Sequence, residues 1–203
     1  MINAVLINTL FNIGAITFGQ NVTLNSGLAS PHYYIDMRVI VSYPNVLRKI
    51  SEHMWEKIKD KECDFICGVP YAGLPIATAM SLNNNKPMLM RRKEKKDHGR
   101  KKTIEGVYKP GQKVIIVEDL FTTGSSTIET IVDLEKEGLI VTEIVILIDR
   151  QQGGVQRLQK MGYPVHVVFL LDEIINQLLA EKKITRKKSE AVLNYAKENQ
   201  ISL

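Results

Sequence analysis

One stretch, residues 113–127, constrains the fold of this chain more than any other. It opens with Lys113-Val114-Ile115-Ile116-Val117, a β-branched run without polar alternation. Such a run is typical of a strand buried on both faces of a parallel sheet. We expect Glu118 and Asp119 to end this strand, and a loop rich in Thr, Gly and Ser to lead into a helix over residues 125–137. The stretch therefore predicts one strand-loop-helix unit of an α/β protein.

The loop after the strand has the composition of an anion cradle. Its backbone N–H groups and the following helix N-terminus would attract a phosphate. Glu118 and Asp119 would repel one, so they must face something that favours negative charge, such as sugar hydroxyls or a carbon that becomes cationic. A ribose 5-phosphate unit offers both. The loop has neither the Gly-Lys-Ser/Thr ending of a Walker loop nor a G-x-G-x-x-G turn, so nucleotide hydrolysis and dinucleotide binding are not supported.

The run Val117-Glu118-Asp119-Leu120-Phe121-Thr122-Thr123-Gly124-Ser125-Ser126 resembles the phosphoribosyl pyrophosphate (PRPP) signature of type I phosphoribosyltransferases. A hydrophobic strand, paired acids, a Thr-x-Gly loop and a helix follow one another in the order of that signature. The alternative is a generic strand-loop-helix unit with two solvated acids. The resemblance implies the type I phosphoribosyltransferase fold, an open and mostly parallel α/β sheet flanked by helices, with a small N-terminal hood.

The rest of the chain alternates between strand and helix patterns, as an open parallel sheet requires. The length of 203 residues, with 44% hydrophobic and 24% charged residues, suits one domain over residues 1–203. We expect the hood over about residues 1–40, with short strands over 22–38. Further strands are predicted over 64–68, 87–91, 142–148 and 165–170, and helices over 1–16, 44–59, 155–161, 172–182 and 185–199. Another helix is expected to follow the Gly/Pro loop over 68–75 and to end at about residue 82.

Much of the net charge of +5 lies in residues 91–102, where Lys and Arg dominate. The segment is too charged to pack in a core and long for a connection, and such loops are often binding elements. A loop with Arg92, Lys93, Lys96 and His98 could close on a pyrophosphate and exclude water. The alternatives are a solvated basic loop or a nucleic-acid patch, and we expect no nucleic-acid binding.

Two further segments extend the resemblance. Residues 92–99 are similar to the catalytic loop of orotate phosphoribosyltransferases, and residues 148–154 are similar to their orotate-binding turn. Ser30-Pro31, Tyr33-Tyr34, Gly68-Val69-Pro70-Tyr71 and Leu74-Pro75 also match, so the likeness runs from about residue 20 to 155. Within that family the chain resembles the phosphoribosyltransferase half of UMP synthase.

The resemblance implies transfer of 5-phosphoribosyl from PRPP to orotate, with Mg²⁺ carried mainly on PRPP and pyrophosphate and with no metal ligands from the protein. It also implies a homodimer in which the catalytic loop acts on the neighbouring subunit. The residues implied in catalysis are Glu118, Asp119, Lys96 and His98. Those implied in substrate binding are Tyr33, Tyr34, Tyr71, Arg92, Lys93, Leu120, Phe121, Thr122, Thr123, Gly124, Ser125, Ser126 and Arg150.

The implied roles divide the substrates among these residues. The loop cations engage pyrophosphate, Tyr71 lines the PRPP site, and residues 118–126 hold the ribose and its 5-phosphate. Thr122 and Arg150 bind orotate, whose carboxylate suits the fork of a guanidinium. Tyr33 and Tyr34 cover the flat ring, although a pair of aromatic residues is often part of a core.

Two positions depart from the family. Asn25 stands where its members usually have a Lys that reaches the active site, and Ala72 stands where many have Lys. The loss at position 25 would weaken binding or rate unless a neighbour substitutes. Two alternatives therefore stay open: a PRPP sensor without catalysis that binds nucleic acid through its basic loop, and a transferase that acts on another base.

Cys63 and Cys67 are the two cysteines, in a C-x3-C spacing that suits neither a zinc ribbon nor a redox C-x-x-C motif. We predict two core thiols and a reducing, cytoplasmic location. The apolar N-terminus has no basic region typical of a signal peptide, and no run is long enough to cross a bilayer. We therefore expect no membrane association.

Overall fold

The computed structural model describes residues 2–19, 22–23, 29–30, 33–93 and 103–201. Its centre is a six-stranded sheet in the order β10-β9-β8-β5-β6-β7. β7 pairs antiparallel with β6, and the other pairings are parallel. This confirms the predicted open, mostly parallel sheet. The strands are β5 (Phe65–Gly68), β6 (Met88–Arg91), β7 (Ile104–Glu105), β8 (Lys113–Phe121), β9 (Ile140–Asp149) and β10 (Val165–Leu170).

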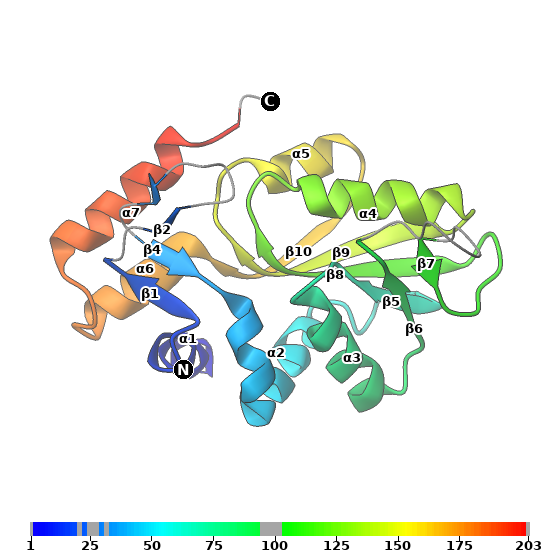
Figure 1. Ribbon diagram of the computed structural model, residues 1–203, viewed down its shortest axis with the longest axis horizontal. Helices are drawn as coiled ribbons and strands as arrows, with labels where there is room; N and C mark the ends of the chain where they lie inside the picture. The colour runs from blue at the N-terminus through cyan, green and yellow to red at the C-terminus, as the bar shows by residue number, and fades with distance from the viewer. Residues whose placement is uncertain (1, 20–21, 24–28, 31–32, 94–102, 202–203) are drawn as a thin grey trace.

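Helices cover both faces of this sheet (Figure 1), and alternate residues of the strands pack against them. In β8, Ile115 and Val117 lie in the core beneath α2 (Pro44–Glu56) and α3 (Gly73–Asn84). Val114 and Ile116 lie in the core beneath α4 (Ser125–Lys136) and α5 (Gly154–Lys160). A strand buried on both faces needs no polar alternation, which is why β8 reads as a continuous hydrophobic run.

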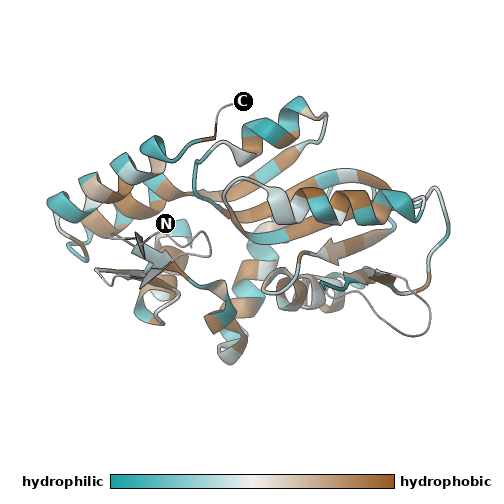
Figure 2. Ribbon diagram, turned by 45° about the horizontal axis from the view of Figure 1, so that its top comes forward, coloured by the Kyte–Doolittle hydropathy of each residue, from teal (hydrophilic) through white to brown (hydrophobic). Residues whose placement is uncertain are grey.

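Three helices form a separate side of the molecule beyond β10. They are α1 (Ile2–Asn12), α6 (Leu171–Ala180) and α7 (Arg186–Glu198). α6 contacts both α1 and α7. Figure 2 shows the strands of the main sheet as largely hydrophobic, whereas α7 alternates between hydrophilic and hydrophobic residues. Such alternation suits a helix with one buried and one solvated face.

The N-terminal strands are separate from the main sheet, as predicted for a hood. β1 (Ile16–Phe18) pairs antiparallel with β4 (Tyr33–Ile35), and β2 (Val22–Thr23) pairs with β3 (Ala29–Ser30). A 3₁₀ helix, η1 (Met37–Ser42), then connects β4 to α2. The assignment of residues 1–203 to one domain stays a prediction.

Two local predictions were wrong. Glu118 and Asp119 do not end β8, because the strand continues to Phe121 through parallel pairing with β9. A strand that was not predicted, β7, follows the basic segment and forms a two-residue antiparallel pairing with β6. Both features come from pairing with a neighbouring strand, which a local pattern does not encode.

The two cysteines are free thiols. Cys67 is fully buried in β5, as predicted, whereas Cys63 is half-buried before the strand. Burial raises the pKa of the Cys67 thiol to about 12. Within the described ranges, no helix is both long and apolar enough to cross a membrane.

Candidate active site

A pocket of about 770 Å³ lies at the carboxyl ends of β5, β8 and β9. This is where ligands bind in open α/β sheets, and the volume suits a nucleotide-sized ligand. The pocket brings together residues that lie far apart in the sequence. Of the predicted site residues, it is lined by Tyr33, Tyr34, Tyr71, Lys93, Glu118, Asp119, Leu120, Phe121, Thr122, Thr123, Gly124, Ser125, Ser126 and Arg150.

The loop from β8 to α4 forms one wall of the pocket. Gly124 precedes the helix with φ 80° and ψ 10°, a left-handed conformation that glycine adopts readily. A Cβ atom at Gly124 would lie 2.7 Å from the ring of Phe121, so space also requires glycine. Ser125 and Ser126, the first residues of α4, are exposed. The unpaired N–H groups of the first helical turn make this wall suitable for a phosphate.

The two acids on β8 are not equivalent. Glu118 is 6% exposed, and its Oε2 accepts a hydrogen bond of 2.7 Å from Thr127 Oγ1. Burial and the neighbouring charge of Asp119 raise the pKa of Glu118 well above its usual range. Burial also raises the pKa of Asp119, to about 6, although a hydrogen bond from Glu118 opposes this shift. Burial therefore favours the protonated form of Glu118 more strongly than that of Asp119, which is the more acidic member of the pair.

Arg150 is held by an aromatic residue of the hood. Its Nε donates a hydrogen bond of 2.8 Å to Tyr33 Oη, and its guanidinium lies 4.9 Å from the centre of the Tyr33 ring. Tyr33 is 2% exposed and packs edge-on against Tyr195 of α7, with the ring centres 6.4 Å apart. Burial raises the pKa of Tyr33. Tyr33 thus positions Arg150, whereas the half-buried Tyr34 has more surface for a flat ligand.

A second cation lies over a ring at the end of β5. Lys93 Nζ is 5.3 Å from the centre of the Tyr71 ring, and both residues line the pocket. Tyr71 is 53% exposed. A cation held in this way adds positive potential to the mouth of the pocket.

Arg92 is a predicted site residue that does not line the pocket. Its Nη1 instead donates a weak hydrogen bond of 3.4 Å to Glu105 of β7. Lys96, His98 and Asn25 lie outside the described residues. The predicted roles of these four residues therefore stay predictions.

Sequence reasoning missed five polar side chains that line the pocket. Asp36 and Arg38 follow β4, and Gln152 lies in the turn that carries Arg150, a segment singled out without this residue. Tyr195 and Asn199 come from the C-terminal part of α7. No motif points to these last two residues, because only tertiary packing brings α7 to the site.

The C-terminal segment also fixes the turn that carries Arg150. The backbone N–H of Ile201 donates to the carbonyl of Gln152 at 3.1 Å, and Gln200 Nε2 donates to the carbonyl of Gln151 at 3.0 Å. A Cβ atom at Gly153 would lie 2.7 Å from Ile201 Cγ1. The end of the chain and the turn are therefore packed in contact.

No group of three or more His, Cys, Asp or Glu side chains in the described part of the chain could hold a metal ion. The carboxyl groups that line the pocket are those of Asp36, Glu118 and Asp119. Asp36 is already paired with Arg38. A metal ion that enters with an anionic substrate could therefore meet Asp119.

Comparisons with known proteins agree with this geometry. A family model described as "Phosphoribosyl transferase domain" matches residues 39–168. The chain is 43% identical over 196 residues to uridine 5′-monophosphate synthase of Bos taurus, which covers 96% of this chain and 40% of that protein. It is 41% identical over 177 residues to orotate phosphoribosyltransferase of Caenorhabditis elegans, which covers 86% of this chain and 78% of that protein.

A solved structure shows the same fold. UMP synthase of Leishmania donovani superposes with a TM-score of 0.87 and 35% sequence identity, and covers 97% of this chain and 42% of that one. The chain thus spans about two fifths of the length of the two synthases, whereas it spans most of the nematode protein.

Proposed function

The chain belongs to the orotate phosphoribosyltransferase family, and we propose that it transfers the 5-phosphoribosyl group from PRPP to N1 of orotate. The products are orotidine 5′-monophosphate and pyrophosphate, in the biosynthesis of UMP. One observation carries this proposal. A single pocket joins the phosphate-binding loop of β8, the acids Glu118 and Asp119, and the tethered guanidinium of Arg150.

At the ribose end, residues 122–126 would hold the 5-phosphate through the helix N-terminus and backbone N–H groups. Asp119, ionised near neutral pH, would accept hydrogen bonds from the ribose hydroxyls and stabilise positive charge at C1 as the C–O bond to pyrophosphate breaks. Glu118, in its protonated form, would stabilise this charge by donating a hydrogen bond to the Asp119 carboxylate. The neutral acid thus orients its charged neighbour.

At the base end, Arg150 would bind the carboxylate of orotate. Its Nε is occupied by Tyr33, so the terminal nitrogens stay directed to the ligand. Thr122 would contribute a hydroxyl to the same substrate, and Tyr34 would cover the ring. Because orotate N1 is acidic, bond formation to C1 requires no strong base from the protein.

Four finer features belong to the proposal. Lys96 and His98 would bind the departing pyrophosphate and deliver a proton to it. Mg²⁺, bound to the pyrophosphate oxygens, would neutralise part of their charge. The loop with these residues would act on the neighbouring subunit of a homodimer. We place the enzyme in the cytoplasm.

The test follows orotate consumption by ultraviolet absorbance with PRPP and Mg²⁺. We expect turnover by the wild type, a loss of at least about a hundredfold in Asp119→Asn, and no effect of Asp60→Asn, an exposed acid far from the pocket. Hypoxanthine, adenine and uracil should not replace orotate. A folded protein that binds PRPP without turnover on any base would contradict the proposal and favour a PRPP sensor.

A further inference from the structure

The proposed substrates carry far more negative charge than the described wall of the pocket can balance. Three cations, Arg38, Lys93 and Arg150, line it together with the acids Asp36, Glu118 and Asp119. Positions 25 and 72, where the resemblance described above implies Lys, hold the uncharged Asn25 and Ala72. Ala72 lines this pocket without contributing a charge. A further cation at the pyrophosphate end, besides those of the basic loop, would therefore strengthen substrate binding.

Arg38 has the geometry of a prepared anion ligand. Its Nε and Nη2 donate to the two carboxylate oxygens of Asp36 at 2.7 and 2.8 Å, and Nη2 also donates to Tyr34 Oη at 3.1 Å. The Asp36 carboxylate accepts the backbone N–H of Arg38 as well, at 3.0 Å, and so caps η1. These four contacts fix both the backbone and the plane of the guanidinium.

One edge of this guanidinium remains open. The Arg38 side chain is 64% exposed although it is tethered on its other edge. Nη1 takes part in no hydrogen bond with the described residues, so its two N–H groups point to solvent or to a ligand. Ordering a long side chain costs conformational entropy. Here Asp36 and Tyr34 order the side chain before any ligand arrives.

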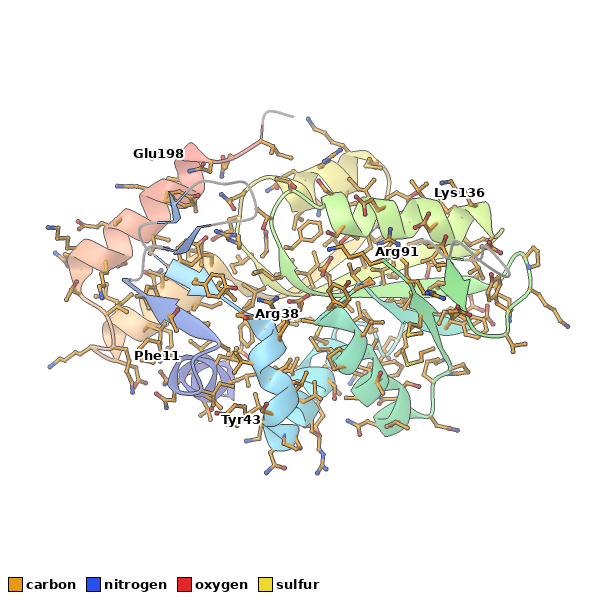
Figure 3. The ribbon with its side chains drawn as sticks, in the orientation of Figure 1. Phe11, Arg38, Tyr43, Arg91, Lys136 and Glu198 are labelled. Carbon is orange, nitrogen blue, oxygen red and sulfur yellow. The ribbon has the colours of Figure 1, made fainter. Side chains whose placement is uncertain are left out.

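The position of Arg38 in the pocket indicates which part of the substrate it would contact. Figure 3 shows Arg38 at the start of η1, between the hood strands and the N-terminal end of α3. Pro70, Tyr71 and Ala72, which precede α3, line the same pocket. Asp36 lies close enough to Asp119 for its charge to raise the pKa of that acid. Through Asp36, Arg38 thus lies on the side of the pocket near Asp119, where bonds at ribose C1 would break, and it is bonded to Tyr34, whose ring would cover the base.

We propose that Arg38 binds the pyrophosphate of PRPP through Nη1, and that Asp36 and Tyr34 position it. This assignment rests on the proposed function and adds a binding residue to it. Arg38 supplies a positive charge from within the hood, on a chain whose residues 25 and 72, Asn and Ala, carry none. Its role is binding and charge stabilisation, without proton transfer, because a guanidinium keeps its protons in proteins.

The test measures binding of pyrophosphate with Mg²⁺ by calorimetry, which requires neither orotate nor turnover. We expect Arg38→Gln to weaken pyrophosphate binding about tenfold. Arg38→Lys keeps the charge but not the fork of the guanidinium, and it should weaken binding only about threefold. Tyr34→Phe should weaken binding by less than Arg38→Gln. The matched control is Arg48→Gln, an exposed arginine on α2 outside the pocket, and it should bind as the wild type does.

Kinetics then separate this inference from the proposed function. With Arg38→Gln the KM for PRPP should rise while the KM for orotate stays within about twofold. Pyrophosphate affinity equal to the wild type, in a variant with an unchanged melting temperature, would overturn the proposal. A rise confined to the KM for orotate would also overturn it. A wild type that binds pyrophosphate through Arg38 but does not turn over orotate would contradict the proposed function and leave this inference standing.

Discussion

At the residue scale, the protonation of Asp119 links the chemistry of the pocket to stability. Its pKa of about 6 in the folded protein lies above the ordinary value of 3.8, because burial disfavours the charged form. The native state then binds a proton that the unfolded chain has released, so stability falls as the pH rises from about 4 through 6. The acid therefore destabilises the enzyme at the pH where it is needed.

The substitution Asp119→Asn should remove this loss of folding stability, because the amide cannot ionise. We expect the variant to be more stable than the wild type by roughly 1–3 kcal/mol at pH 8, and to differ much less at pH 4, where the acid is largely neutral. Urea unfolding at the two pH values measures the difference, and turnover should be lost. Equal stability of the two proteins at pH 8 would show that the acid carries no such cost.

Tyr33 gives a second prediction at this scale. Removal of its hydroxyl in Tyr33→Phe leaves Arg150 Nε without its 2.8 Å acceptor, so the guanidinium loses its orientation. The KM for orotate should rise about tenfold, while the KM for PRPP stays unchanged. Tyr163→Phe, which removes a hydroxyl bonded to the remote Glu135, should change neither value. An unchanged KM for orotate in Tyr33→Phe would refute the positioning role.

The two tyrosines also show where sequence reasoning stops. Adjacent residues of a strand point to opposite faces, so Tyr33 and Tyr34 could not share one role. Which of them faces inward depends on the pairing of β4 with β1, where Tyr33 lies opposite Phe18 and Tyr34 opposite Thr17. Neither side chain reveals that register. The motif therefore predicted that both residues lie in the pocket. It did not predict that Tyr33 positions Arg150 whereas Tyr34 offers its surface to a flat ligand.

At the scale of elements, the site depends on contact between the loops after β8 and β9. The N–H of Gly154 donates to the carbonyl of Thr122 at 3.1 Å. A Cβ atom at Gly154 would lie 2.5 Å from that carbonyl oxygen and 2.6 Å from Phe121 Cε1. The two loops approach this closely because residue 154 has no side chain.

Gly154→Ala should therefore separate the phosphate-binding loop from the turn that carries Arg150. We expect a loss of stability of roughly 1–3 kcal/mol and a loss of turnover of more than about tenfold. Thermal unfolding and orotate consumption measure the two effects. The control is Gly162→Ala, where a Cβ atom would meet nothing within 4 Å but φ is +91°; it should lower stability and leave turnover intact. Full activity of Gly154→Ala would show that the loops tolerate the separation.

β8 illustrates how far the elements could be predicted. Its hydrophobic run and the Thr-x-Gly loop predicted the strand, the loop and α4 in the correct order. Its end could not be read from the same residues, because Leu120 and Phe121 extend the strand only where β9 supplies Ile148 and Asp149 as partners. Glu118 therefore lies within the sheet, and its burial and raised pKa follow from that position.

At the scale of the whole molecule, alternation of strand and helix predicted the sheet and the edge at which the pocket lies. It could not predict that α7 closes the base end, because Tyr195 reaches the site across the fold from a segment without any motif. Packing against Tyr33 and contact of α7 with α6 bring it there. Long-range contacts of this kind join the hood, the sheet and the C-terminal helix in one site.

The largest remaining prediction concerns two copies of the chain. If the loop with Lys96 acts on the neighbouring subunit, each active site combines Asp119 from one chain with Lys96 from the other. The inactive variants Lys96→Ala and Asp119→Asn would then complement each other. A mixed dimer holds one site with both defects and one with none.

Refolding the two variants together in equal amounts makes about half of the dimers mixed, so we expect recovery of about one quarter of wild-type activity. Asp119→Ala mixed with Asp119→Asn should recover nothing, because both chains carry the defect in their own pocket. Size-exclusion chromatography would first establish that dimers form. Dimers without recovery in the first mixture would mean that each loop serves its own pocket. In that case Lys96 and Arg38 of one chain would bind the same pyrophosphate, and the site would be complete within a single subunit.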